Sequence, residues 1–134
     1  MARKAIIFDL YGVIRPTLSG SNDHQLLQYT AELRSSYKIG LLSNIGTDTL
    51  AAYLKDKQFA DCFDVTIASG STGFTKPHPE AYLLAAHQLG VEPADCLMVD
   101  DSADCCEGAR EVGMQAHLYT TLAELKKSLR EQYA

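Results

Sequence analysis

The sequence predicts a single α/β domain, built from a parallel sheet with helices on both faces. Apolar, β-forming segments alternate with helix-like segments along the whole of residues 1–134, and this alternation is typical of a parallel sheet. The first strand is a continuous hydrophobic run, as expected for a strand that is buried on both faces. Neither a repeat nor a linker interrupts the pattern, so we expect one domain.

Length and composition are those of an ordinary globular protein. The chain has 134 residues, of which 46% are hydrophobic and 22% charged, enough to bury a core. A net charge of −5 without a basic cluster makes nucleic acid or an anionic membrane an unexpected partner. The first apolar run ends at Asp9, so it is too short for a transmembrane helix or a signal sequence.

The four cysteines predict a reduced, cytoplasmic protein. They show no CxxC spacing, and neighbouring cysteines such as Cys105 and Cys106 seldom bridge each other. We expect Cys62 and Cys96 to pack as small hydrophobic residues.

Hydrophobic spacing and turn residues predict the elements of the first half. Residues 4–10 read as a strand, and a loop rich in glycine and proline follows. A helix over residues 23–36 has its apolar side chains at helical spacing. The next elements are a strand, a helix and a strand, over residues 38–43, 48–57 and 64–69.

The second half continues the alternation. A helix begins at Pro79, which suits a first helical turn, and ends near Gly90. A strand over residues 96–99 and a helix over 103–111, closed by Gly113, come next. A short strand over 116–119 and a helix over 121–130, capped by a threonine, complete the chain. Polar His78 is expected in a turn between two prolines, and Tyr29, Tyr53 and Tyr82 at packing positions of helices.

Chemically reactive side chains lie at the carboxyl ends of three predicted strands. Asp9 ends the first strand, Ser43 and Asn44 end the second, and Asp100 and Asp101 follow the fourth. Ligands of open α/β sheets bind beyond these ends, although a lone aspartate there can simply terminate its strand. If the three strands are neighbours, the five residues converge.

Their convergence would create a site for a cation and an anion. Three carboxylates cannot lie close together as free anions without strongly raised pKa values, and Mg²⁺, which takes oxygen ligands, would relieve their repulsion. Lys76, in the loop before a helix, adds a positive charge that suits phosphate, and Ser43 offers a hydroxyl group. A carboxylate nucleophile beside a metal fits covalent catalysis through an aspartyl intermediate.

Four segments in order resemble the motifs of the haloacid dehalogenase (HAD) superfamily, and the resemblance covers nearly the whole chain. These segments are residues 6–13, 41–44, 76–80 and 97–102, the last followed by 108–114. The resemblance implies a Rossmann-like, doubly wound three-layer fold in which the first strand lies between the second and the fourth. Residues 10–42, between Asp9 and Ser43, leave room for a loop and a helix but not for a cap domain.

The resemblance also assigns roles. Asp9 would be the nucleophile, Ser43 would bind the transferring group, and Lys76 would neutralise both the nucleophile and the phosphate. The catalytic and substrate-binding set would be Asp9, Tyr11, Ser43, Asn44 and Lys76. The ligands of Mg²⁺ would be Asp9, the Tyr11 carbonyl and Asp101, with Asp100 either a further ligand or a residue that contacts the ligands.

Tyr11 departs from the family's phosphatases, in which an aspartate stands two residues after the nucleophile. That aspartate protonates the leaving oxygen and then activates water, whereas a phenol with an ordinary pKa near ~10 exchanges protons poorly at neutral pH. The Asp-x-Tyr-Gly pattern is similar to that of the 2-haloacid dehalogenases. Those enzymes use an arginine from a cap and generally no metal, so the Asp100-Asp101 pair and the missing cap favour phosphate chemistry.

Besides Tyr11 and the missing cap, Cys105 is a third and smaller departure, because many relatives have Asn or Asp there to orient the lysine. The loss of that contact would loosen Lys76, while the simpler interpretation of Cys105 and Cys106 is packing of their helix.

Two functions from different classes follow. The first is a Mg²⁺-dependent hydrolase that acts through an aspartyl phosphate on a phosphorylated small molecule or macromolecule, with weakened acid/base chemistry. The second is a catalytically impaired binding or interaction module with the same fold; 2-haloacid dehalogenation is a third hypothesis. Without a cap, the site implies bulky substrates or cover from a second copy of the chain.

Overall fold

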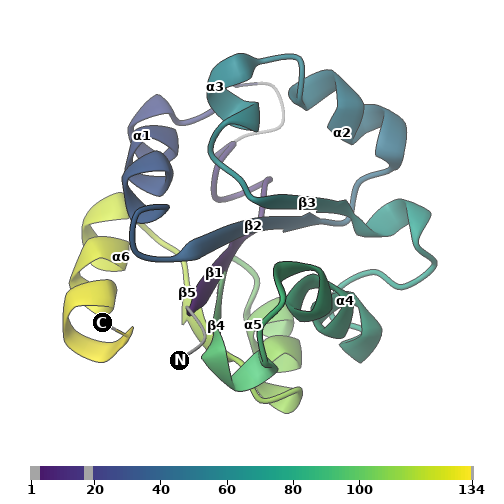
Figure 1. Cartoon of the computed structure of the whole chain (residues 1–134), viewed down its shortest axis with the longest axis vertical. Helices are drawn as coiled ribbons and strands as arrows, with labels where there is room; N and C mark the ends of the chain where they lie inside the picture. The colour runs from purple at the N-terminus through teal and green to yellow at the C-terminus, as the bar shows by residue number, and fades with distance from the viewer. Residues whose placement is uncertain (1–3, 17–19, 134) are drawn as a thin grey trace.

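The computed structural model describes residues 4–16 and 20–133, and at its centre lies a sheet of five strands in the order β3-β2-β1-β4-β5 (Figure 1). All four strand pairs are parallel. The strands are β1 Ala5–Phe8, β2 Lys38–Ser43, β3 Val65–Ala68, β4 Cys96–Asp100 and β5 Gln115–Leu118. This order confirms the doubly wound parallel sheet and places β1 between β2 and β4.

Helices cover both faces of the sheet. They are α1 His24–Leu33, α2 Thr47–Tyr53, α3 Lys57–Ala60, α4 Pro79–Leu89, α5 Ala103–Glu111 and α6 Leu122–Ser128. Side chains alternate along a strand, so Ile6 and Phe8 of β1 join the core beneath α1, α2, α3 and α6, whereas Ala5 and Ile7 join the core beneath α4 and α5. Figure 1 shows these two helical layers on opposite sides of the strands.

The predicted helix over residues 48–57 is confirmed only as far as Tyr53, and its continuation is wrong, because the chain forms two shorter helices there. α2 ends at Tyr53, and α3 begins at Lys57. The Asp56 carboxylate accepts a hydrogen bond from the Gln58 backbone N–H at 3.0 Å, and aspartate favours this capping position over a helix interior. The segment therefore starts a new helix instead of continuing the old one.

Several other predicted boundaries are confirmed with small shifts. Asp23 caps α1 and Thr121 caps α6 through their side chains, and Gly90 ends α4 in the left-handed region with φ 72°. The predicted helix over residues 23–36 ends earlier, at Leu33. His78 caps α4, since its Nδ1 accepts from the Glu80 backbone N–H at 3.1 Å, which is the turn role expected for it.

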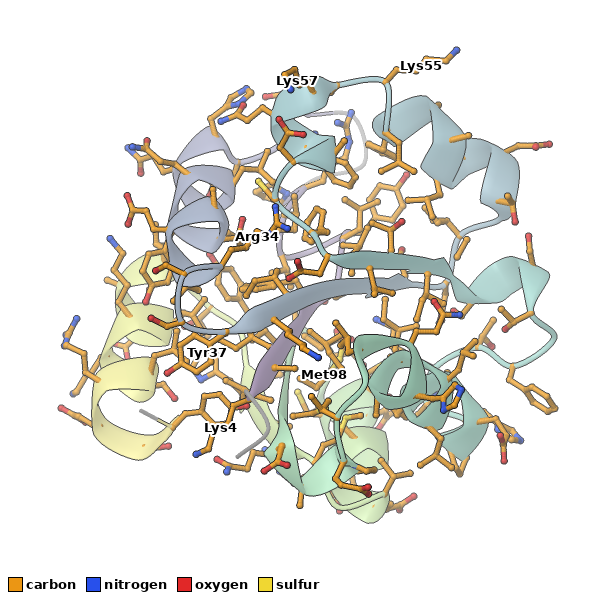
Figure 2. The ribbon with its side chains drawn as sticks, viewed as in Figure 1. Lys4, Arg34, Tyr37, Lys55, Lys57 and Met98 are labelled. Carbon is orange, nitrogen blue, oxygen red and sulfur yellow. The ribbon has the colours of Figure 1, made fainter. Side chains whose placement is uncertain are left out.

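The helical turn Leu129–Tyr133 packs at the end of the sheet where the strands begin. The buried Tyr133 hydroxyl lies 2.6 Å from the Ala5 carbonyl oxygen and 2.8 Å from that of Asp95. This single hydroxyl group therefore links the first residue of β1 to the residue just before β4. The Tyr133 ring stacks on Tyr37 at 5.7 Å and lies beneath the Lys4 ammonium group at 5.0 Å. Figure 2 shows Lys4 and Tyr37 beside this turn, at the edge of the sheet where β1 begins.

All four cysteines are free thiols, and Cys62 and Cys96 are buried as small core residues, as predicted. Of the residues 10–42 that the structure describes, none belongs to an additional domain; they form a loop, α1 and most of β2. No helix within residues 4–16 and 20–133 is both long and apolar enough to cross a membrane.

Candidate active site

The predicted site residues converge on one cavity at the carboxyl edge of the sheet. The cavity has a volume of about 310 Å³ and is lined by Asp9, Tyr11, Ser43, Asn44, Ile45, Lys76, Asp100, Asp101, Ser102 and Cys105. β1, β2 and β4 are adjacent in the sheet, so residues far apart in sequence meet where these strands end. The structure thus brings together every residue of the predicted site.

Lys76 lies at the centre of the charged groups. Its Nζ donates to Asp9 Oδ1 at 2.9 Å and to Asp100 Oδ2 at 2.8 Å, and the lysine side chain is only 2% exposed. Burial alone would lower the pKa of Lys76, but the two carboxylates outweigh it and the pKa is raised. Lys76 therefore remains a cation, and the expectation that Cys105 would leave it loose is wrong, because these two ion pairs hold it.

Asp9 lies between opposing electrostatic effects. Desolvation by burial raises its pKa, attraction to Lys76 lowers it, and repulsion from Asp100 raises it again; the result is a pKa of about 6. The side chain retains 13% exposure toward the cavity. Asp9 thus titrates near neutrality in the protein without metal, and a bound cation would hold it in the ionised form.

Asp100 and Asp101 lie in different environments. Asp100 is 1% exposed; its Oδ2 accepts from Lys76 and its Oδ1 accepts from the Ser102 backbone N–H at 3.0 Å. Asp101 is exposed, and burial first, then the charge of Asp100, raises its pKa. Asp100 therefore anchors the lysine, while Asp101 faces solvent and the cavity.

Gly12 is required beside Asp101 for two reasons. Its φ of 87° is in the left-handed region, which a side chain disfavours. A Cβ atom at this position would also collide with the Asp101 carboxylate. The turn after Asp9 can therefore approach the acidic pair only with glycine at position 12.

The carboxylates have the donor set of a site for a hard cation. One oxygen from each of Asp9, Asp100 and Asp101 lies within 4.8 Å of the other two. Carboxylate oxygens with space for water or phosphate are the ligands that Mg²⁺ favours in proteins. The three residues thus fit the predicted magnesium. Burial first, and then repulsion from Asp100, raise the pKa values of Asp9 and Asp101, and a bound cation would favour their ionised forms.

Asn44 holds the backbone segment that carries Lys76. Its Nδ2 donates to the Lys76 carbonyl oxygen at 3.1 Å, and its Oδ1 accepts from the Lys76 backbone N–H at 2.8 Å. The fully buried Ser69 hydroxyl lies 2.7 Å from Asn44 Oδ1 and 3.0 Å from the Ser43 carbonyl oxygen. Asn44 is therefore a positioning residue for Lys76; its contact with substrate stays a prediction, as does that of the buried Ser43.

Tyr11 lines the cavity, and its hydroxyl group is hydrogen-bonded to that of another tyrosine. The Tyr11 and Tyr53 hydroxyl oxygens are 2.8 Å apart, and their rings meet edge to face. Burial and this bond raise the pKa of Tyr53 to about 12, and the Arg15 guanidinium lies 5.6 Å from the Tyr53 ring centre. Tyr11 and Tyr53 therefore form an aromatic pair, of which Tyr11 lines the same cavity as Asp9.

Sequence reasoning missed two of these residues. Ser69 follows β3, whose end lies beside that of β2, so a polar residue at a fourth strand end was an available signal. Tyr53 gave no such signal, because its spacing on α2 predicts only packing. Its partner lies 42 residues away, and their contact depends on how α2 is placed on the sheet.

Comparison with known proteins identifies the family. A model described as a haloacid dehalogenase-like hydrolase matches residues 23–113, more than half of the chain. Phosphatase MT3486 of Mycobacterium tuberculosis is 41% identical over 86 residues, which are 63% of this chain and 40% of that protein. The (S)-2-haloacid dehalogenase of Xanthobacter autotrophicus is 33% identical over 97 residues, 72% and 38% of the two chains. This chain thus spans about two fifths of the length of these curated relatives.

Solved structures show the same fold at low identity. A HAD-like family hydrolase of Porphyromonas gingivalis superposes with a TM-score of 0.80 at 18% identity, covering 97% of this chain and 99% of that one. A HAD family enzyme of Bacteroides thetaiotaomicron, in complex with magnesium and inorganic phosphate, gives a TM-score of 0.76 at 18% identity, covering 92% and 99%. The family match, the sheet order and these superpositions agree: the chain belongs to the haloacid dehalogenase-like hydrolase family.

Proposed function

We propose that this chain is a Mg²⁺-dependent phosphohydrolase that acts through an aspartyl phosphate on Asp9. The observation that carries the proposal is the convergence of Asp9, Asp100 and Asp101 within 4.8 Å of one another, beside the buried ammonium group of Lys76. Both a relative named as a phosphatase and a structural neighbour that holds magnesium and phosphate support it.

Each residue has a distinct part in the proposed reaction. Asp9 is the nucleophile, and Lys76, held in place by Asp100 and through its backbone by Asn44, neutralises both the attacking carboxylate and the phosphoryl oxygens. Ser43 binds the transferring group. Bound to the three carboxylates and the Tyr11 carbonyl, Mg²⁺ would supply charge stabilisation of the phosphoryl oxygens.

The proposed substrate class follows from the poor ability of Tyr11 to donate a proton to a leaving group. A tyrosine hydroxyl that is bound to Tyr53 does not supply the readily exchanged proton that an alkoxide leaving group needs. We propose that the substrates are phosphorylated small molecules or macromolecules whose leaving groups depart without a proton, such as acyl or aryl phosphates. Cover of the site by a second copy of the chain, and a cytoplasmic location, stay predictions.

Replacement of Tyr11 by Asp should raise the rate of hydrolysis of alkyl phosphate monoesters, because a carboxyl group can protonate the leaving oxygen. General acid catalysis of this kind contributes about 10²-fold or more. Steady-state kinetics on an alkyl and an aryl phosphate would measure the change, with Tyr11→Asn as the control of similar size that cannot supply a proton. An unchanged or lower rate on the alkyl ester in Tyr11→Asp would show that the leaving-group argument is wrong.

Magnesium affinity should fall as the pH drops through about 6. The pKa of Asp9 is about 6 in the metal-free protein, so below this pH a cation must displace a proton, whereas above it the carboxylate is already ionised. Calorimetric titration in buffers of different ionisation enthalpy would count the protons that are released per bound ion. Binding without pH dependence would remove Asp9 from the ligand set.

The second candidate is a catalytically impaired binding module. The Tyr11–Tyr53 hydrogen bond favours it, since the position that is an acid and base in the family's phosphatases is tied to another side chain. An aryl phosphate assay with and without Mg²⁺ separates the candidates: phosphate release that disappears in Asp9→Asn supports the hydrolase, and binding of Mg²⁺ without any turnover supports the module. Halide release from a 2-haloacid would instead support the dehalogenase hypothesis.

A further inference from the structure

Among residues 4–16 and 20–133, no side chain that lines the cavity around Asp9 is placed to take a proton from water. Among the described residues that line it, none is a histidine, and the carboxylates are those of Asp9, Asp100 and Asp101. The remaining positions 1–3, 17–19 and 134 carry neither carboxylate nor imidazole side chains in the sequence. A base for the second half of a phosphatase reaction would therefore have to be Asp100 or Asp101.

Both members of the acidic pair are engaged otherwise. Asp100 accepts from Lys76 at 2.8 Å and from the Ser102 backbone at 3.0 Å, and its side chain is buried. Asp101 converges with Asp9 and Asp100, where its oxygens would face a cation. A carboxylate that neutralises a cation is a poor acceptor for the proton of an attacking water molecule.

Two neutral side chains of the site, those of Tyr11 and Cys105, do not provide the missing base either. Tyr11 stands at the position of the acid and base in the family's phosphatases, and its hydroxyl is 2.8 Å from that of Tyr53. Cys105 also lines the cavity, and burial raises the pKa of its thiol, so the thiol stays protonated. In the part of the chain that the structure describes, the site thus holds a nucleophile and groups suited to phosphate, but no group suited to activate water.

We infer that the phosphoryl group stays on Asp9 long after its transfer, so that the aspartyl phosphate accumulates. The inference rests on the proposed function and concerns its second step. In the first step an Asp9 oxygen attacks phosphorus, and the bond to the leaving oxygen breaks; the electron pair leaves with a carboxylate or phenolate that needs no proton. In the second step water attacks phosphorus and releases the Asp9 carboxylate, and the water must lose a proton to a base.

The test mixes the protein, Mg²⁺ and an aryl phosphate and follows phenolate release in the first turnover. We expect a burst close to one phenolate per chain and then a slow steady rate. Intact-mass spectrometry should show one added phosphoryl group, which is absent in Asp9→Asn and removed by hydroxylamine. Tyr11→Asp should shorten the lifetime of this adduct by about 10²-fold or more, the usual contribution of a general base, whereas Tyr11→Asn should not shorten it.

Tyr53→Phe tests the tyrosine pair without touching the cavity lining. If the two hydroxyls relayed a proton from water, the loss of one would slow decay of the adduct, and that result would overturn the inference. Steady turnover without a burst or adduct would also overturn it while leaving the proposed hydrolase intact. Absence of both turnover and adduct, in protein that unfolds cooperatively and binds Mg²⁺, would overturn the two together.

Discussion

Asp9→Asn should abolish the release of phosphate from aryl phosphates. The amide of asparagine is not a nucleophile, so the covalent route is lost and the rate should fall by about 10³-fold or more. The substitution conserves shape, and Lys76 keeps its ion pair with Asp100 at 2.8 Å. The fold should therefore survive, and a thermal unfolding curve would verify it.

A matched control for Asp9→Asn is Asp61→Asn. The Asp61 carboxylate pairs with Lys57 at the surface, with side-chain exposures of 62% and 88%, where an ion pair contributes little. This variant should retain the parent rate. Equal phosphate release by Asp9→Asn and the parent would mean that the measured activity does not originate at Asp9.

Lys76→Met should lower the free energy of unfolding by about 3–5 kcal/mol at neutral pH, the usual cost of removing one partner of a buried ion pair. The side chain is 2% exposed and joins two carboxylates, so its removal leaves Asp9 and Asp100 facing each other without compensation. Urea denaturation in metal-free buffer would measure the loss. Lys57→Met, at the exposed pair with Asp61, is the control and should change stability by less than about 0.5 kcal/mol.

The pH dependence of this loss has a definite sign. Asp9 already has a folded pKa of about 6, above the ordinary aspartate value of 3.8, and removal of Lys76 takes away an attraction that lowers it. A raised folded pKa means that the folded state binds more protons, so stability falls as the pH rises through that window. The deficit of Lys76→Met should thus be largest at and above neutrality and should shrink below pH 6.

Added Mg²⁺ should restore part of the stability that Lys76→Met loses, because a cation that binds only the folded state stabilises it. The same addition should stabilise the parent less, since Lys76 already compensates the carboxylates there. A variant that is as stable as the parent without metal would contradict the central place of Lys76 in the site.

The sequence anticipated the location of the site because strand ends are local features. Asp9, Asp100 and Asp101 each follow a run of apolar, β-forming residues, and parallel strands place their carboxyl ends at one edge. The pairing of β1 with both β2 and β4 then required the acids to meet. Gly12 lies in the glycine-containing loop that the sequence predicts after the first strand, but its close approach to the Asp101 carboxylate, which leaves no space for a Cβ atom, depends on a segment distant in the chain.

Contacts between side chains of different helices, strands and loops could not be predicted from the sequence. The Tyr11–Tyr53 hydrogen bond depends on where α2 ends. The sequence pattern predicts one continuous helix there, because it does not show that Asp56 caps a new helix instead of continuing the old one. The binding of substrate by Asn44 stays a prediction, while the contact of the Asn44 amide with the Lys76 backbone was not anticipated. Only the path of the loop after β3 determines that contact.

The order of apolar and polar segments was sufficient by itself to determine the parallel sheet, its helical layers and the edge on which the acidic residues gather, because burial and strand polarity act through local pattern. The tertiary structure alone decided which of these groups neutralise one another: Lys76 between Asp9 and Asp100, Asn44 against the lysine backbone, and Tyr11 against Tyr53. Hydrogen bonds and ion pairs depend on distances of a few ångströms between segments that are remote in the chain, and no spacing in the sequence encodes those distances.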